Sequence, residues 1–157
     1  MIKPAPSKPF KDGFEFAETR RTLPIALLRA REALMERFRP ILNAHDVTEQ
    51  QWRILRILQE GREINATALA ERSCVLAPSL TRMLRALVSR GLIETAKDPK
   101  DGRRFLISIT KEGQNFIARL APESAAIYAQ IEAKLGHARI EQLLDDLGEV
   151  LQVLRQD

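Results

Sequence analysis

Apolar residues recur three and four positions apart along most of the chain, and this spacing is typical of amphipathic helices. The first such stretch covers residues 18–43 and predicts one long helix through Leu23, Leu27, Leu34, Phe38 and Ile41. Pro24 is tolerable in this helix only near the first turn, and Pro40 should bend or interrupt it near its end.

Two shorter helices should follow, each marked by a start or a stop signal. Thr48 precedes an apolar pattern and has Gln51 three residues later, as in a capping box. The helix that begins there should end near Glu60, because Gly61 favours the left-handed backbone that terminates helices. After a short extended stretch, a third helix is expected over about 66–73.

A fourth helix and two strands complete the central part of the chain. Pro78 suits the first turn of a helix, Gly91 should end it, and one face carries Leu80, Leu84 and Leu87. The pattern then changes to the alternation of strands over residues 92–96 and 104–109, with the polar tip "KDPKDGR" between them. Three helices followed by such a hairpin indicate a winged helix-turn-helix.

The remaining residues should form two more helices. Thr110 and Gly113 open one that bends near Pro122 and continues towards Leu135. The last helix carries more apolar side chains than a short helix on a small core needs: Ile140, Leu143, Leu144, Leu147, Val150, Leu151 and Leu154. A partner subunit would cover this surplus, and the alternative is that the helix folds back on its own domain.

The expected fold class is therefore mainly α with a small β-wing. A flexible arm is expected at residues 1–17, because three of the eight prolines alternate there with lysine. The other expected parts are a dimerisation helix at 18–45, a winged helix-turn-helix DNA-binding domain at 46–110, and dimerisation helices at 111–157.

Charge and composition exclude several classes of protein. The net charge of +4 and the pI of about 9.6 allow an anionic partner such as nucleic acid. No apolar run reaches the roughly 20 residues that span a bilayer, and no signal-peptide core is visible, so a cytoplasmic protein with no membrane partner is expected. No nucleophile elbow, phosphate loop, dinucleotide fingerprint or zinc-ligand cluster occurs, so neither an enzyme nor a cofactor or metal is expected. Cys74 precedes Val75 and Leu76, which favours a small buried side chain over a redox sensor.

Two basic segments indicate DNA binding. In a helix-turn-helix the second helix enters the major groove with its first residues, which here include Ser79, Thr81, Arg82 and Arg85. On an isolated helix these residues would more simply be a solvated charged face. The hairpin tip adds four positive side chains against Asp98 and Asp101, namely Lys97, Lys100, Arg103 and Arg104. A wing beside the recognition helix reaches the minor groove or phosphates, so we expect Arg103 to insert there, with Asp101 holding its guanidinium.

Several stretches carry a resemblance to a known family. The stretches "LTRMLRALVSRGLIE" and "LISITKEG" accompany a wing motif of Asp101, any residue and Arg103, with nine residues from Asp101 to Thr110. Together they resemble the MarR family of bacterial winged-helix regulators. "LPIALLRAREALMERFRPIL", "VTEQQWRILRIL" and "LAPSLTRML" are similar to the branch that regulates homoprotocatechuate degradation operons. The resemblance covers about residues 20–150 and implies a homodimeric repressor on a pseudo-palindromic double-stranded DNA operator, released by a phenolic acid effector.

Five side chains are candidates for binding such an effector. Arg31 falls within the apolar stripe of the first helix, and Arg20 falls on the same line. A guanidinium among apolar side chains needs an anionic partner, which is either a glutamate of the chain or an aromatic carboxylate. Trp52 and Arg56 share another helix face and could hold an aromatic acid, although a dimer or inter-helix contact would explain the pair equally. His45 is the remaining candidate.

Two other kinds of protein fit the same residues. One is a MarR-type regulator that responds to another small aromatic ligand or to oxidation at Cys74. The other is an architectural DNA-binding protein without an effector. Titration of an effector against operator binding separates the architectural protein from a repressor, and peroxide treatment tests Cys74.

Overall fold

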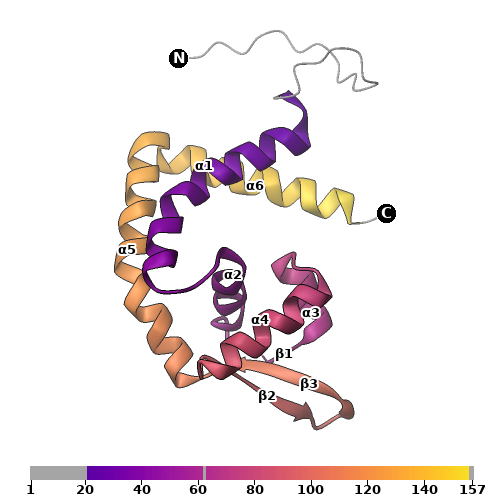
Figure 1. The fold of residues 1–157 in the computed structure, drawn as a ribbon. Helices are drawn as coiled ribbons and strands as arrows, with labels where there is room; N and C mark the ends of the chain where they lie inside the picture. The colour runs from indigo at the N-terminus through magenta and orange to yellow at the C-terminus, as the bar shows by residue number, and fades with distance from the viewer. Residues whose placement is uncertain (1–20, 62, 156–157) are drawn as a thin grey trace. The chain divides into compact units, whose positions relative to one another are not determined.

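The structure is a computed structural model that describes residues 21–61 and 63–155, so the arm predicted at 1–17 and Arg20 lie outside the described residues. The elements, in chain order, are α1 (Leu23–Ala44), α2 (Glu49–Leu58), β1 (Ile64–Asn65), α3 (Ala66–Ser73), α4 (Ala77–Ser89), β2 (Ile93–Asp98), β3 (Asp101–Ile109), α5 (Lys111–Leu135) and α6 (His137–Leu154) (Figure 1). The fold divides into two compact units, one with α1 up to Arg37 and the other from Phe38 onward.

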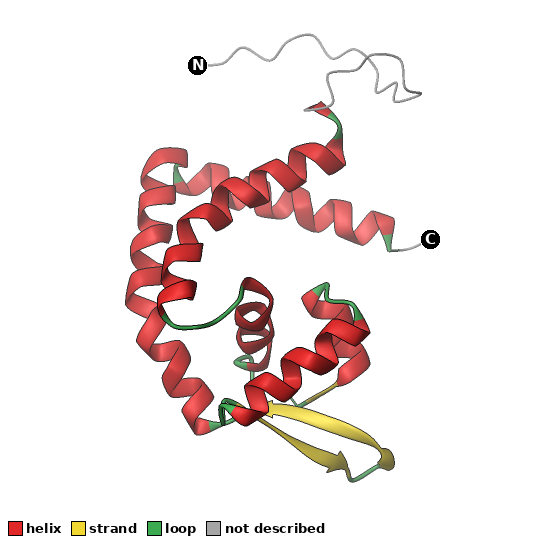
Figure 2. Cartoon of the chain, in the orientation of Figure 1, coloured by secondary structure: helices red, strands yellow, loops and turns green. Residues whose placement is uncertain are grey.

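The fold class is mainly α with a small β-wing, as the sequence predicted. Helices make up most of the described chain, and the strands form one antiparallel sheet of order β1-β3-β2 (Figure 2). The hydrophobic core of the protein lies where α2, α3, α4 and the start of α5 meet this sheet. The least exposed side chains there are Ile54, Leu55, Leu58, Leu69, Leu80, Leu87, Ile93, Ile107, Ile117 and Leu120.

The predicted helix starts are confirmed by their caps. Thr48 accepts a hydrogen bond from the Gln51 backbone N–H at 3.1 Å, and the Gln51 side chain accepts one from the Thr48 N–H at 3.0 Å. Pro24 lies in the first turn of α1, where a missing N–H costs nothing. Of the two outcomes predicted for Pro40, a bend or an interruption, the interruption is wrong, because α1 continues to Ala44. Phe38 and Leu42 are buried on either side of the proline, and their packing supports the turn that the proline weakens.

The wing is longer than the sequence predicted. The two strands extend to Asp98 and Asp101, which pair across the hairpin, so only Pro99 and Lys100 form the turn. A register irregularity between Lys97 and Asp98 precedes that turn. The tip is therefore an ordered two-residue turn on a long ribbon, instead of the seven-residue loop expected from its Pro, Gly and charged residues.

Cys74 lies on the surface, so the predicted buried position is wrong. Its backbone is left-handed, with φ of 52°, and it ends α3 as a carboxyl-terminal cap. The buried place belongs to Ser73, whose hydroxyl donates a hydrogen bond to the Leu69 carbonyl at 2.6 Å. Ser73 lies one helical turn after the buried Leu69 and therefore faces inward, whereas Cys74, the next residue, faces solvent.

The start of α5 packs tightly against the root of the wing. Thr110 accepts a hydrogen bond from the Gly113 N–H at 3.0 Å, and its hydroxyl donates to the Gly91 carbonyl at 2.6 Å. A Cβ atom on Gly113 would lie 2.1 Å from the Leu92 carbonyl oxygen and 2.6 Å from Cγ1 of Ile109. Only glycine fits there. From this point α5 runs through Pro122 to Leu135, as predicted.

The last helix exposes much of its apolar surface in the single chain. Leu144 is 58% exposed and Leu151 is 56% exposed, and Leu143, Val153 and Leu154 are exposed as well. Ile140, Leu147 and Val150 are half-buried. The exposed apolar side chains that the sequence predicted for the last helix are therefore present on α6. Within the described residues, no helix has the length and apolar character needed to cross a membrane.

Candidate nucleic-acid interface

The outer face of α4 carries the predicted recognition residues. Thr81, Arg82 and Arg85 are exposed and Ser79 is half-buried. The Thr81 hydroxyl donates to the Ala77 carbonyl at 3.2 Å, which turns this side chain towards its own helix. The buried face consists of Leu80, Met83 and Leu87, whereas Leu84, which we expected in that stripe, is only half-buried. The two guanidiniums are thus presented to solvent by a helix anchored on its other side.

The wing presents its basic side chains on an ordered tip. Lys97, Lys100, Arg103 and Arg104 are all exposed. The predicted fork between Asp101 and the Arg103 guanidinium is wrong. Asp101 instead accepts a hydrogen bond from the Arg103 backbone N–H at 3.1 Å and pairs with Nε of Arg104 at 3.3 Å. At the end of the turn the carboxylate bends over the main chain, so among the described residues no acidic side chain pairs with the Arg103 guanidinium.

A groove of about 570 Å³ runs beside the wing, mainly between α3 and β3. Its lining comes from five elements, with Asn65 on β1, Thr67 and Glu71 on α3, Leu84 on α4, Thr95 on β2, and Arg103, Arg104 and Phe105 on β3. Two of the predicted wing residues, Arg103 and Arg104, line this groove, whereas the predicted α4 residues lie outside its lining. In a winged helix-turn-helix, the recognition helix enters the major groove and the wing reaches the adjacent phosphates or minor groove.

The proposed effector residues lie elsewhere in the chain. The Arg31 guanidinium pairs with the neighbouring Glu32 carboxylate at 2.9 Å, which is the internal partner that the sequence allowed. Arg56 is exposed and donates to the Gln59 side chain; with Arg53, Ile57, Glu60 and Arg72 these two residues line a surface depression of about 540 Å³. Trp52 is half-buried and is not part of that depression.

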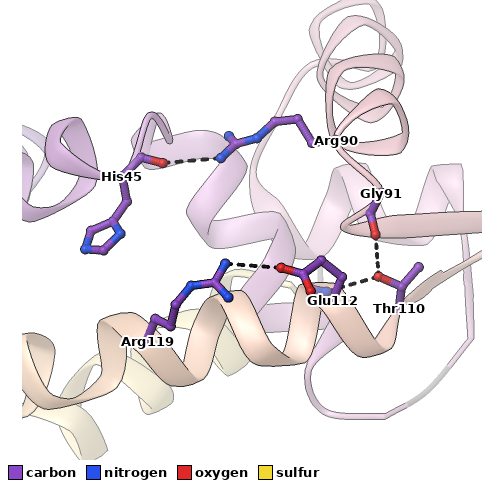
Figure 3. Close-up of polar contacts among 7 residues, drawn as sticks. His45, Arg90, Gly91, Thr110, Glu112 and Arg119 are labelled. Atoms are coloured by element: carbon purple, nitrogen blue, oxygen red, sulfur yellow. Dashed lines mark hydrogen bonds and ion pairs between the residues drawn. The ribbon is translucent and has the colours of Figure 1, made fainter.

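His45 belongs to a contact network that the sequence did not reveal. Its Nε2 lies 3.2 Å from Oε1 of Glu123, and its ring meets Phe116 edge-on with centroids 6.2 Å apart. Arg90, at the end of α4, donates from Nη2 to the His45 carbonyl at 3.2 Å (Figure 3). His45 therefore has structural partners from α4 and α5 in the single chain. Arg90 and Phe116 were missed because their partners are distant in sequence, and no local pattern marks them.

Comparison with known proteins decides the family of this chain. The model of the MarR family matches residues 47–105. The homoprotocatechuate degradative operon repressor of Escherichia coli is 45% identical over 130 residues, which are 83% of this chain and 88% of that protein. The chain belongs to the MarR family. It is a DNA-binding transcriptional regulator, as the wing motif and the recognition helix predicted.

Two solved structures resemble this MarR-family regulator over most of its length. NadR in complex with 4-hydroxyphenylacetate is 40% identical, with a TM-score of 0.76 over 82% of this chain and 92% of that chain. CouR bound to a 23-mer DNA duplex is 27% identical, with a TM-score of 0.76 over 92% of this chain and 99% of that chain. The fold of this MarR-family chain is thus shared with a protein solved on duplex DNA.

Replacing Arg103 by alanine in this MarR-family regulator should weaken binding to all DNA sequences alike. If its guanidinium meets a phosphate, the slope of log affinity against log salt concentration should flatten by about one unit. Fluorescence anisotropy at several salt concentrations measures both quantities, and Lys134→Ala, which removes a positive charge from the last turn of α5, is the control. An unchanged affinity and slope in a folded Arg103→Ala dimer would contradict a wing contact.

Substitutions in α4 should change sequence preference as well as affinity. A guanidinium that forms two hydrogen bonds with a guanine discriminates against other bases by about 1–3 kcal/mol. Arg82→Ala, and Thr81→Ala to a smaller degree, should therefore reduce the difference in affinity between the operator and single-base variants of it. Competition binding against a panel of such variants measures this difference. If both proteins retain the wild-type ranking of variants, Arg82 and Thr81 do not read bases.

Proposed function

We propose that this protein is a homodimeric repressor of an operon for aromatic-acid breakdown, and that a phenolic acid releases it from its operator. The 45% identity to the homoprotocatechuate degradative operon repressor, over 83% of the chain, carries this proposal. The similarity to NadR, solved with 4-hydroxyphenylacetate, supports the choice of effector. The protein would act in the cytoplasm, by binding and not by catalysis.

The proposed dimer uses the helices at both ends of the chain, 18–45 and 111–157. Exposed leucines on α6 and on α1 support this assignment, because apolar patches of this kind on a soluble protein are usually covered by a partner. The domain at 46–110 would then be present twice. Two recognition helices on one face of DNA lie about 34–36 Å apart, so the operator should be a pseudo-palindrome.

The proposed DNA contacts divide into two groups. Ser79, Thr81, Arg82 and Arg85 of α4 would meet base edges and phosphates in the major groove. The wing would contribute Lys97, Lys100, Arg103 and Arg104, with Asp101 shaping the tip. The exposure of Thr81, Arg82 and Arg85 on α4, and of the four basic side chains on the wing, supports this division.

The proposed effector contacts are Arg31, Trp52 and Arg56, with Arg20 and His45 as further candidates. The guanidinium of Arg31 would bind the carboxylate of the acid, in exchange for or in addition to Glu32. The Trp52 indole would cover the aromatic ring. The dimer would have two arrangements, one that fits the operator and one that does not. To cause release, the acid must bind the second arrangement more tightly than the first, and for ordinary coupling the two binding free energies differ by about 1–3 kcal/mol.

Titration with 4-hydroxyphenylacetate tests this function. We expect calorimetric binding to the wild type and a loss of operator affinity in the same concentration range. Arg31→Ala should weaken binding of the acid by roughly 10-fold to 100-fold, since a hydrogen bond to a charged group contributes about 1.5–3 kcal/mol. Trp52→Ala should weaken it by up to about 10-fold, since contact between two aromatic rings contributes about 0.5–1.5 kcal/mol beyond the area that it buries. Arg29→Ala, an exposed arginine on the same helix, is the matched control.

Two results would count against this proposal in different ways. Binding of the acid that survives both Arg31→Ala and Trp52→Ala would clear these two residues of the role. No binding and no release with any phenolic acid would refute the effector while leaving DNA binding intact.

A further inference from the structure

Arg90 connects three elements through one guanidinium. It is the residue that caps the carboxyl end of α4, and its side chain crosses to the turn that follows α1. Nη1 donates a hydrogen bond to the Asp46 carbonyl at 2.5 Å. Nη2 donates a second one to the His45 carbonyl at 3.2 Å, which Figure 3 shows. The guanidinium carbon also lies 5.2 Å from the centroid of the Phe116 ring on α5. The end of the recognition helix is thus tied to the end of α1.

A cation is favourable beside these two carbonyls, which directly follow the carboxyl end of α1. The last carbonyls of a helix lack helical partners and carry the negative end of its dipole, which lysine or arginine in the last turn usually meets. The last turn of α1 has no basic residue. Asp46 then adopts a left-handed backbone, with φ of 52°, which turns the chain towards α2. Arg90 supplies from α4 the positive charge that α1 does not carry itself.

A second group of contacts fixes the α5 side of this junction. The Arg119 guanidinium also lies over the Phe116 ring, with its carbon 5.6 Å from the ring centroid. Arg119 is held in turn by Glu112 at 3.2 Å (Figure 3). His45 reaches α5 separately through Glu123. The Arg90 guanidinium therefore occupies a defined position between the α1 turn and α5.

The fold of the junction does not depend on the Arg90 side chain. The backbone N–H of Arg90 bonds to the Ala86 carbonyl, and the Gly91 carbonyl is bound by the Thr110 hydroxyl. Arg90 itself is exposed, and exposed charge contacts contribute little to stability. Its two hydrogen bonds nevertheless link the carboxyl end of α4 to the turn after α1, so they bear on the direction of α4. A helix of 13 residues is about 20 Å long, so a tilt of about 10° moves its far end by about 3 Å.

We propose that Arg90 is a positioning residue that transmits the arrangement of the α1 end to α4, and so sets the half-site spacing at which two subunits bind DNA. The inference rests on the proposed homodimer, and its effector arm rests on the proposed release by a phenolic acid. A movement of the α1 turn would pull on the carboxyl end of α4 through this guanidinium. The amino-terminal part of α4, with Arg82 and Arg85, would then leave the spacing that the operator requires.

The test compares wild type, Arg90→Gln, Arg90→Lys and Arg119→Gln on operators whose half-sites are one base pair closer or farther apart. The wild type should lose about tenfold in affinity on either altered operator, because each base pair shifts the half-site by about 3.4 Å and rotates it. Arg90→Gln should reduce this loss to about threefold or less. Arg90→Lys, which can still donate to a carbonyl, should restore part of the preference. Arg119→Gln, which removes the other cation on Phe116, should behave as wild type.

The same proteins are then titrated with 4-hydroxyphenylacetate. Arg90→Gln should bind the acid with an affinity within about twofold of wild type. In an ordinarily coupled protein, the acid would lower operator affinity by about 5-fold to 150-fold; in Arg90→Gln this loss should be about threefold or less. If the acid neither binds nor releases the wild type, the proposed effector fails, and the spacing series alone decides the role of Arg90.

Three results would overturn the inference. The first is a folded Arg90→Gln dimer that keeps the wild-type spacing preference. The second is an equal loss of that preference in Arg119→Gln, which would mean that any disturbance around Phe116 has this effect. The third is a wild type without spacing preference. Should Arg90→Gln fail to fold, Arg90→Lys decides, because a full wild-type preference with only a single ammonium would refute a role for the forked guanidinium.

Discussion

A variant with aspartate at both Leu144 and Leu151 should be a folded monomer that binds the operator about 100-fold more weakly than the wild type, or weaker still. The two leucines lie seven residues apart on α6, on one line of the helix, and each exposes more than half of its side chain in the single chain. A charge in an apolar contact between subunits must lose its water without gaining a partner. A monomer contacts one half-site at a time, and the gain of about 10²–10⁴ from binding two sites together is lost.

Sedimentation or light scattering gives the mass of this variant, and anisotropy gives its operator affinity. Gln142→Asp with Gln152→Asp adds the same two charges at polar positions of α6 and should remain dimeric. Circular dichroism should show that the variant keeps its helices, because Leu144 and Leu151 are not buried in the chain itself. A Leu144→Asp, Leu151→Asp protein that stays dimeric would show that the two subunits meet through another surface.

Replacing Gly113 by alanine should lower the free energy of unfolding by about 3 kcal/mol or more. The new methyl group would lie 2.1 Å from the Leu92 carbonyl oxygen. The same oxygen accepts a hydrogen bond from the Thr110 backbone N–H at 3.1 Å. Neither group can move without separating α5 from the root of the wing. Overpacking of a tight contact typically costs about 1–3 kcal/mol of stability. The cost should be at the upper end of this range or beyond it, because the clashing atom is a backbone oxygen that cannot rotate away as a side chain can.

Thermal unfolding measures this loss, which should appear as a drop in Tm of about 6–12 °C for a chain of this size. Gly102→Ala in β3 is the matched control, since nothing lies within 4 Å of the Cβ built there. It should leave the free energy of unfolding within about 0.5 kcal/mol of the wild-type value, as surface substitutions usually do. Equal effects of the two substitutions would show that α5 and the wing root separate easily.

Local patterns were enough to predict most of the elements. The capping box at Thr48, the glycine after α4 and the alternation in β3 each depend on neighbours within a few residues, so a sequence contains the whole signal. The same is true of the surplus leucines on α6. The predicted basic residues of α4 and the wing are exposed because nothing in a small core could accept them.

The wrong predictions share a different cause. Cys74 was placed by the apolar character of its neighbours, but the helical face of α3 that buries Leu69 also buries Ser73 and leaves Cys74 exposed at the following turn. From their spacing, we expected Asp101 to pair with the Arg103 guanidinium. In the structure Asp101 pairs with Asp98 across the hairpin, and the Asp101 carboxylate faces the main chain and Arg104. Arg90 meets Asp46 across 44 residues, and a contact of that range has no local signature.

The carboxylates at the wing tip determine how the wing meets DNA. Asp98 accepts a hydrogen bond from the Lys100 N–H at 2.8 Å, and Asp101 holds the Arg103 N–H. The tip is thus ordered before any DNA arrives, so association freezes the free ends of its long side chains without having to freeze the main chain of the turn. Immobilising a long side chain costs about 0.5–1.5 kcal/mol, and a loose loop would add its backbone entropy to that amount. Asp98 and Asp101 therefore have two opposite effects on DNA affinity: their charges repel the phosphates, and the order that they give the turn lowers the entropic cost of binding. The entropic gain should grow with temperature, and salt should screen the repulsion, so the net contribution of the two residues to affinity should become more favourable with both.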